Sequence, residues 1–132
     1  MLRDFRSYPA LETTFRGRIV VVTGENGAGK TNLLEAISLL GPGRGLRGAR
    51  MSELGRRTPG EQPRPWAAAG RFENALGHFD IGTGTAPTQE GCGSGGPDRR
   101  VWRLDNAPVR SAGELAERIA AVWLTPQMDR LF

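Results

Sequence analysis

The chain has 132 residues and a formal net charge of +4. This length allows at most one domain with one modest hydrophobic core. No apolar run approaches the roughly 18 residues of a membrane span, and the charged start predicts that there is no signal peptide. Cys92 is the only cysteine, so an internal disulfide is excluded and a reducing, cytoplasmic setting is expected.

The N-terminal residues predict three strands. Segments 2–8 and 11–15 have the pattern of two short strands, with Pro9 near the turn between them. Residues 18–23, RIVVVT, are a β-branched run that is typical of a strand buried on both faces.

From Lys30 the pattern becomes helical. Leu33, Ile37 and Leu40 follow the i, i+4, i+7 spacing of one helix face, and GPG at 41–43 ends the helix. A strand, a glycine-rich loop and a helix are therefore expected in that order.

The loop itself, GENGAGKT at 24–31, fits the phosphate-loop pattern G-x-x-x-x-G-K-[ST]. Its glycines let backbone N–H groups turn inward around an anion, and the helix that follows adds the positive end of its dipole. Lys30, the only lysine in the chain, is placed to reach the β- and γ-phosphates, and Thr31 to hold Mg²⁺. The glycine spacing does not fit a dinucleotide-binding Rossmann loop. We therefore predict a nucleoside triphosphate site.

The middle of the chain, 49–110, predicts a variable antiparallel β region. Segments 66–72, 77–83 and 99–105 read as strands, and 105–109 as a turn. The glycine-rich stretch 90–98 reads as a long hairpin loop or a disordered tip.

The last segment, 111–132, predicts a helix followed by a strand. Ser111 and Glu114 form a capping-box pattern at the start of a helix. Leu115, Ile119 and Val122 follow the i, i+4, i+7 spacing of one face of that helix. VWLTPQ at 122–127 then reads as one more buried strand.

A cluster of arginines gives the chain its basic character. Such a window fits a solvated face and a nucleic-acid contact equally well. Its members are Arg44, Arg47, Arg50, Arg56 and Arg57.

Other reactive residues favour structural roles. His78 has no metal-ligand partner at a suitable spacing, and Cys92 has no base beside it in the sequence. Trp66, Trp102 and Trp123 lie in strand-like runs and are expected in the core.

Three stretches together resemble the RecF family of DNA replication and repair ATPases, which belongs to the SMC-like branch of the ABC-type ATPases. They are LRDFRSYPALE at 2–12, TGENGAGKTNLLEAISLLGPGRGLR at 23–47 and VWLTPQMDRLF at 122–132. The resemblance implies an α/β fold: a P-loop NTPase of the ABC-type ATPase head, with antiparallel strands beside the P-loop strand and helix. Motifs that the family carries further along are missing, so we expect residues 1–132 to be the N-terminal part of an incomplete head.

The resemblance also implies a function. RecF-type proteins bind ATP with Mg²⁺, form an ATP-dependent homodimer, and bind DNA at junctions between single and double strands. They work with RecO and RecR in recombinational gap repair, DNA replication and the SOS response, in the cytoplasm and without a membrane.

Matching positions carry the expected site. Arg6 and Ser7 correspond to family residues close to the nucleotide, and Gln127 falls near a Q-loop residue that contacts Mg²⁺. The nucleotide-binding residues are then Gly24, Glu25, Asn26, Gly27, Ala28, Gly29, Lys30, Thr31, Arg6 and Ser7, with Thr31 and Gln127 as metal ligands.

No catalytic residue is predicted, because no apolar run ending in Asp-Glu occurs in the chain and the signature motif is missing. We therefore expect no ATP hydrolysis by the chain alone. Two alternatives stay open: a non-catalytic basic DNA-binding module, and a truncated remnant without independent ATPase activity.

Overall fold

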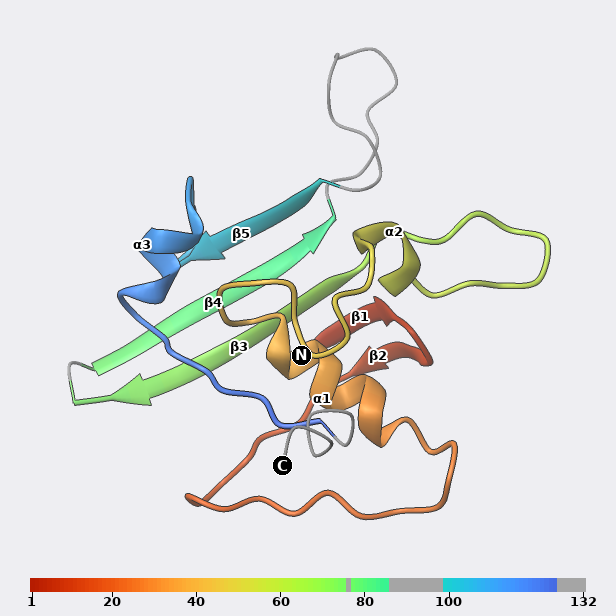
Figure 1. Ribbon diagram of the computed structural model, residues 1–132, viewed down its shortest axis with the longest axis horizontal. Helices are drawn as coiled ribbons and strands as arrows, with labels where there is room; N and C mark the ends of the chain where they lie inside the picture. Colours follow the sequence, from red (N-terminus) through yellow and green to blue (C-terminus); the bar gives the residue numbers. More distant parts are fainter. Residues whose placement is uncertain (76, 86–98, 126–132) are drawn as a thin grey trace, which may run out of the picture.

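The computed structural model describes residues 1–75, 77–85 and 99–125. Its centre is a six-stranded antiparallel sheet in the order β2-β1-β3-β4-β5-β6 (Figure 1). The strands are β1 (Leu2–Phe5), β2 (Tyr8–Leu11), β3 (Ala67–Asn74), β4 (Gly77–Thr85), β5 (Arg100–Leu104) and β6 (Ala107–Pro108). The helices of the described residues are α1 (Lys30–Ser38), α2 (Met51–Leu54) and α3 (Ala112–Ala116).

The first hairpin is shorter than expected. Its strands pair from Leu2↔Leu11 to Phe5↔Tyr8, so the turn lies at positions 6 and 7 and not near Pro9. Pro9 lies inside β2, which is an edge strand of the sheet and therefore tolerates a residue without an N–H donor. The expected position of the second strand at 11–15 is wrong: β2 is Tyr8–Leu11, and no strand is formed at 12–15.

The three strands expected in the middle of the chain are confirmed. β3 pairs with β4 from Ala67↔Gly84 to Asn74↔Gly77, and β5 then pairs with β4. The turn expected after β5 has Asp105 and Asn106 at φ 49° and 67°, a region that Asn and Asp tolerate. The hairpin loop expected at 90–98 lies outside the described residues.

Helix α1 packs on the sheet, and most of the core lies between them. Leu40 lies over Gly70, where an added Cβ would come within 3.0 Å of the leucine. Trp66 meets Phe5 edge-to-face at 5.2 Å and donates from its indole nitrogen to the carbonyl of Met51, which anchors α2. The buried apolar residues are Leu2, Phe5, Ala36, Leu39, Leu40, Leu54, Trp66, Ala68, Phe79, Ile81 and Leu115.

The buried face of α1 differs in part from the expected one. Helix α1 ends at Ser38, so Leu40, which is buried as expected, lies beyond the helix, while Leu33 and Ile37 within it are only half-buried. The helix instead buries two polar residues, Glu35 and Ser38. The Ser38 hydroxyl donates to the carbonyl of Glu35 and accepts from the N–H of Leu46, so its burial leaves no unmade hydrogen bond.

One arginine of β5 ties the sheet to the end of α1. The Arg100 guanidinium donates to the carbonyls of Leu39 and Gly43, and it stacks 4.2 Å from the ring of Trp102. Burial lowers the pKa of Arg100 to about 10, so the group stays protonated at neutral pH. A cation at the end of a helix also complements the helix dipole.

Two expected buried strands are not formed. Residues 18–23 are assigned no strand, and Ile19 and Val21 are 86% and 78% exposed. Residues 122–125 are also unpaired in the described part of the chain, with Val122 90% exposed. A β-branched run favours an extended backbone, but a strand needs a neighbour to pair with. No described strand of this sheet pairs with either segment.

The expected C-terminal helix begins as predicted but ends early. Ser111 accepts from the N–H of Glu114, which confirms half of the capping box. The Glu114 carboxylate accepts from the N–H of Arg110 and not from that of Ser111. Helix α3 ends at Ala116, with Leu115 as its buried anchor, so the expected face reaching Val122 is wrong.

The described helices include none that is both long and apolar enough to cross a bilayer.

Candidate functional site: a phosphate loop and its adjoining pocket

The loop at 24–31 has the backbone that its glycines permit. Gly24, Gly27 and Gly29 have φ of 150°, 87° and 92°, which L side chains rarely adopt. The chain turns through an Ala28 N–H to Glu25 carbonyl hydrogen bond and enters α1 at once. The first turn of α1 has no side-chain cap. Backbone donors and the positive end of the helix dipole therefore meet at one exposed point.

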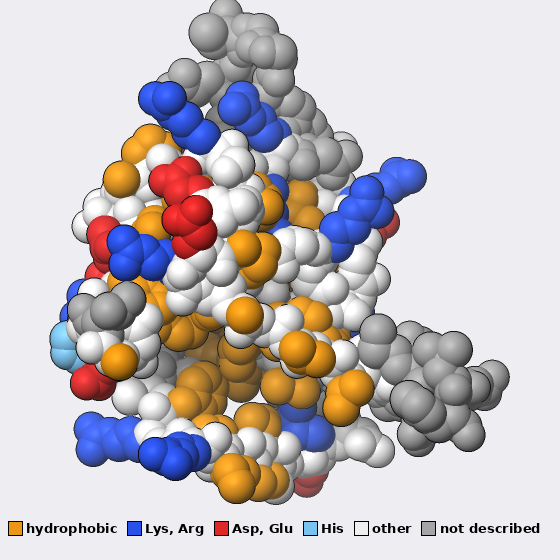
Figure 2. Space-filling model, turned by 60° about the vertical axis from the view of Figure 1, so that its left-hand side comes forward, with side chains coloured by type: hydrophobic (Ala, Val, Ile, Leu, Met, Phe, Trp, Pro, Cys, Tyr) orange, Lys and Arg blue, Asp and Glu red, His pale blue; other side chains and the backbone are white. Residues whose placement is uncertain are grey.

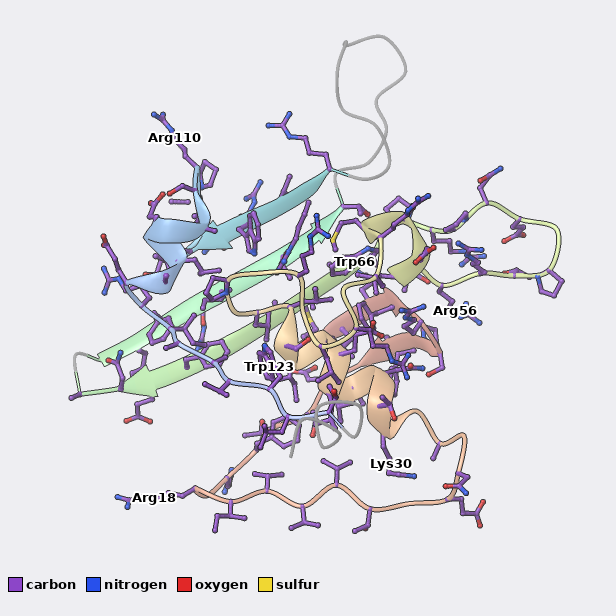
Figure 3. The ribbon with its side chains drawn as sticks, viewed as in Figure 1. Arg18, Lys30, Arg56, Trp66, Arg110 and Trp123 are labelled. Atoms are coloured by element: carbon purple, nitrogen blue, oxygen red, sulfur yellow. The ribbon has the colours of Figure 1, made fainter. Side chains whose placement is uncertain are left out.

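Lys30 closes this loop with its ammonium group. The Nζ atom donates to the carbonyls of Gly24 and Glu25 at 2.7 and 2.6 Å. Figure 3 shows the Lys30 side chain at the start of α1, beside the loop that leads into the helix. These bonds use two of the three donors of the ammonium, so the positive charge is held at the start of the loop with one donor left.

The turn of the first hairpin packs against the end of the loop. An added Cβ on Gly29 would lie 2.8 Å from the Tyr8 hydroxyl oxygen and 3.1 Å from Ser7 Oγ. The Asn32 side-chain amide donates to Ser7 Oγ at 3.0 Å. The hairpin and the phosphate loop therefore form one unit, although they are separate in the sequence.

A polar pocket of about 480 Å³ lies where this hairpin, α1 and the segment after α2 meet. Arg6 and Ser7, which the sequence predicts near a nucleotide, are both in its wall. The lining residues are Arg6, Ser7, Asn32, Glu53, Gly55 and Arg57. Four of these, Asn32, Glu53, Gly55 and Arg57, had not been expected at the site, because they reach it only through the fold.

The arginine at this pocket is held by a buried carboxylate. Arg6 donates from Nε and Nη2 to the two oxygens of Glu35 at 3.0 and 2.9 Å. Arg47 Nη1 lies 3.6 Å from the same carboxylate. No local sequence pattern predicts this cluster, because Glu35 lies on the side of α1 opposite Leu33 and Ile37, where a solvent-exposed polar residue is expected.

The remaining expected site residues differ in their placement. Asn26 and Thr31 are exposed on the loop and at the first turn of α1, as an accessible ligand site requires. Gln127 lies outside the described residues, so its metal-ligand role stays a prediction. Among the arginines of the basic window, Arg44, Arg50 and Arg57 are exposed and form no ion pair with any described residue.

Comparisons with known proteins agree with this geometry. A family model described as an AAA domain matches residues 1–47. The DNA replication and repair protein RecF of Caulobacter vibrioides is 48% identical to the chain over 99% of its length. The RecF of Rhizobium meliloti is 44% identical, again over 99% of the chain. The chain covers 32% and 33% of these two relatives.

A solved structure adds a likeness in three dimensions. It is described as the recombination mediator protein RecF-ATP in the RecFOR pathway, and it matches with a TM-score of 0.77 at 26% identity. The match covers 98% of this chain and 32% of that one. The fold expected from the sequence, part of a P-loop NTPase head of the ABC type, is confirmed. The chain spans about a third of the length of the curated relatives it matches, and over nearly its whole length it is similar to RecF proteins.

Proposed function

We propose that this chain binds ATP at residues 24–31 and is the nucleotide-binding segment of a RecF-type protein of DNA replication and repair. One observation carries the proposal: three glycines with positive φ lead directly into a helix start without a side-chain cap, where the Lys30 ammonium is held. This arrangement suits an anion with several phosphates. The ATP named with the solved RecF relative favours the adenine nucleotide.

Each residue of the site has a role in this proposal. The ammonium of Lys30 leaves its loop carbonyls and binds the β- and γ-phosphates, while the N–H groups of the loop and the first turn bind phosphate oxygens. The exposed hydroxyl of Thr31 suits Mg²⁺, which prefers oxygen ligands and neutralises phosphate charge when bound. The polar pocket that contains Arg6 and Ser7 takes the nucleoside part of the ligand.

The binding test compares two single-charge changes. Mg-ATP affinity is measured calorimetrically for the wild type, Lys30→Ala and Arg103→Ala, because Arg103 is an exposed cation on β5 away from the loop. Lys30→Ala is expected to weaken binding by at least about tenfold, equivalent to about 1.4 kcal/mol, and Arg103→Ala to leave it unchanged. Equal affinity in all three proteins would refute the phosphate site.

ATP hydrolysis by the chain alone is not expected. Hydrolysis needs a group that orients the attacking water and a second acid on the metal, and the sequence has no Asp-Glu run to supply them. The assay is phosphate release by the purified chain. Steady turnover that Lys30→Ala abolishes would contradict this expectation.

Nucleic-acid binding is the second proposed activity, supported by the exposed arginines of the basic window that form no ion pair with a described residue, among them Arg44 and Arg57. The test is DNA affinity as a function of salt for the wild type and for the double change of these two arginines to alanine. Loss of two phosphate contacts should lower the slope of log K against log salt by about two. The control changes Arg16 and Arg18 to alanine. An equal decrease of the slope in this control would rule out a specific DNA-binding face at Arg44 and Arg57.

The wider role is inferred from the likeness to RecF proteins. We propose that the chain acts in the cytoplasm within an ATP-dependent homodimer. Its partners are RecO, RecR and DNA junctions between single and double strands, in recombinational gap repair and the SOS response. The name of the solved relative, which places it in the RecFOR pathway, supports this assignment.

A further inference from the structure

Glu35 is a buried carboxylate that pairs with arginines outside its own helix. It lies on α1, five positions after Lys30, and is 1% exposed. Both of its oxygens accept from Arg6, at 3.0 and 2.9 Å, and Arg47 approaches to 3.6 Å. A buried charge is tolerated where partners and hydrogen bonds compensate it, which is the case here.

Arg6 is fixed by these bonds in one orientation. Besides the two bonds to Glu35, its Nη1 donates to the carbonyl of Glu53 at 3.1 Å. Its backbone has φ 50°, in the tight turn of the first hairpin. A guanidinium has five N–H donors, so two remain after these three bonds, and Arg6 is part of the pocket wall.

The charge of Arg6 is largely offset by its partner. An arginine paired bidentately with a carboxylate contributes little net charge to a ligand, but its remaining N–H groups keep a defined direction. Lys30 differs, since among the described residues its ammonium donates only to neutral carbonyls. Lys30 is therefore suited to phosphate, and Arg6 to neutral acceptors such as ribose hydroxyls and ring nitrogens.

We propose that Glu35 is a positioning residue. It holds Arg6 at the pocket and thereby sets the affinity for the nucleoside part of the nucleotide, without affecting the phosphate part. This inference rests on the proposed ATP site and adds a separate determinant to it. The ion pair between Glu35 and Arg6 also connects α1 with the turn of the first hairpin.

The test separates the two parts of the ligand. Affinities for Mg-ATP and for inorganic tripolyphosphate, which has no nucleoside, are measured for the wild type and for Glu35→Gln. The variant should lose about tenfold or more in ATP affinity and change by less than about twofold toward tripolyphosphate. Glu61→Gln is the matched control, because Glu61 is an exposed glutamate that pairs only with Arg64 among the described residues, and it should change neither affinity.

A second variant covers the case in which Glu35→Gln does not fold, as judged by circular dichroism. Arg6→Lys keeps the positive charge but cannot make the bidentate contact, and it should show the same loss confined to ATP. Equal weakening of both ligands, or of neither, in the folded variants would overturn the proposal. Lys30→Ala should weaken both ligands, so its failure to do so would refute the phosphate site itself, independently of Glu35.

Discussion

Replacing Gly29 by alanine is predicted to destabilise the chain more than the same change at Gly27. Both glycines have positive φ, 92° and 87°, so a Cβ strains the backbone at either position by about 1–2 kcal/mol. Their surroundings differ. At Gly29 the added Cβ would lie 2.8 Å from the Tyr8 hydroxyl and 3.1 Å from Ser7 Oγ, whereas nothing lies within 4 Å at Gly27.

The crowding at Gly29 sets the size of the difference. Forcing an extra carbon into a packed contact costs about 1–3 kcal/mol. The hydroxyl end of a half-buried tyrosine can shift by part of an ångström, which favours the lower half of that range. The free energy of unfolding should therefore fall by about 2–4 kcal/mol for Gly29→Ala and about 1–2 kcal/mol for Gly27→Ala.

Urea unfolding followed by tryptophan fluorescence measures both changes, because Trp66 is 2% exposed in the folded chain. Repeating the measurement in a Tyr8→Phe background adds a control. Removal of the hydroxyl should reduce the loss of unfolding free energy caused by Gly29→Ala and leave the loss caused by Gly27→Ala unchanged. Equal losses at the two glycines, or no effect of the background, would refute the packing of the hairpin turn on the phosphate loop.

Three further predictions follow from other contacts. Arg100→Met should lower the free energy of unfolding by about 2–3 kcal/mol, because it leaves the carbonyls at the end of α1 without their donor; Arg99→Met, an exposed neighbour, should have little effect in the same urea assay. Val21→Lys should reduce aggregation measured by light scattering, because this 78% exposed side chain lies in a strand-like segment that pairs with no described strand. Unchanged aggregation would contradict a role of residues 18–23 in aggregation. The hydrogen bond from Arg71 holds the pKa of Asp80 below its usual range. The stability from this pair is therefore present above the ordinary carboxyl pKa and is lost as the pH falls through the lowered value. Asp80→Asn should remove this part of the acid dependence of stability, measured by thermal melts at different pH values.

The conformation of the loop at 24–31 could be predicted from the sequence because its geometry is local. Gly24, Gly27 and Gly29 occur where positive φ is needed, and Lys30 and Thr31 follow in the spacing that one helix turn imposes. The strands of the middle region could be predicted for a similar reason, since β3, β4 and β5 pair with neighbours in the chain.

Features that depend on distant partners could not be predicted. Residues 18–23 have the composition of a buried strand, but composition does not supply the neighbouring strand. Pro9 suggested a turn, and only its position on an edge strand explains why it lies within β2. The contact of Glu35 with Arg6 and Arg47 likewise joins three separate segments, so no local pattern contains it.

The pairing of β1 with β3 has a consequence for the order of folding. Strands β3 and β4 are separated by two residues in the sequence, whereas Leu2 of β1 pairs with Ala68 of β3 although β2, α1, α2 and their loops lie between them in the chain. Closing a long loop costs more entropy than closing a hairpin, so contacts of this kind form late. We expect pulse-labelled hydrogen exchange to show protected amides in β3 and β4 before those of β1 and α1. The loop at 24–31 is then expected to gain its shape only in the last step of folding, and the proposed ligand would stabilise the part of the chain that orders last.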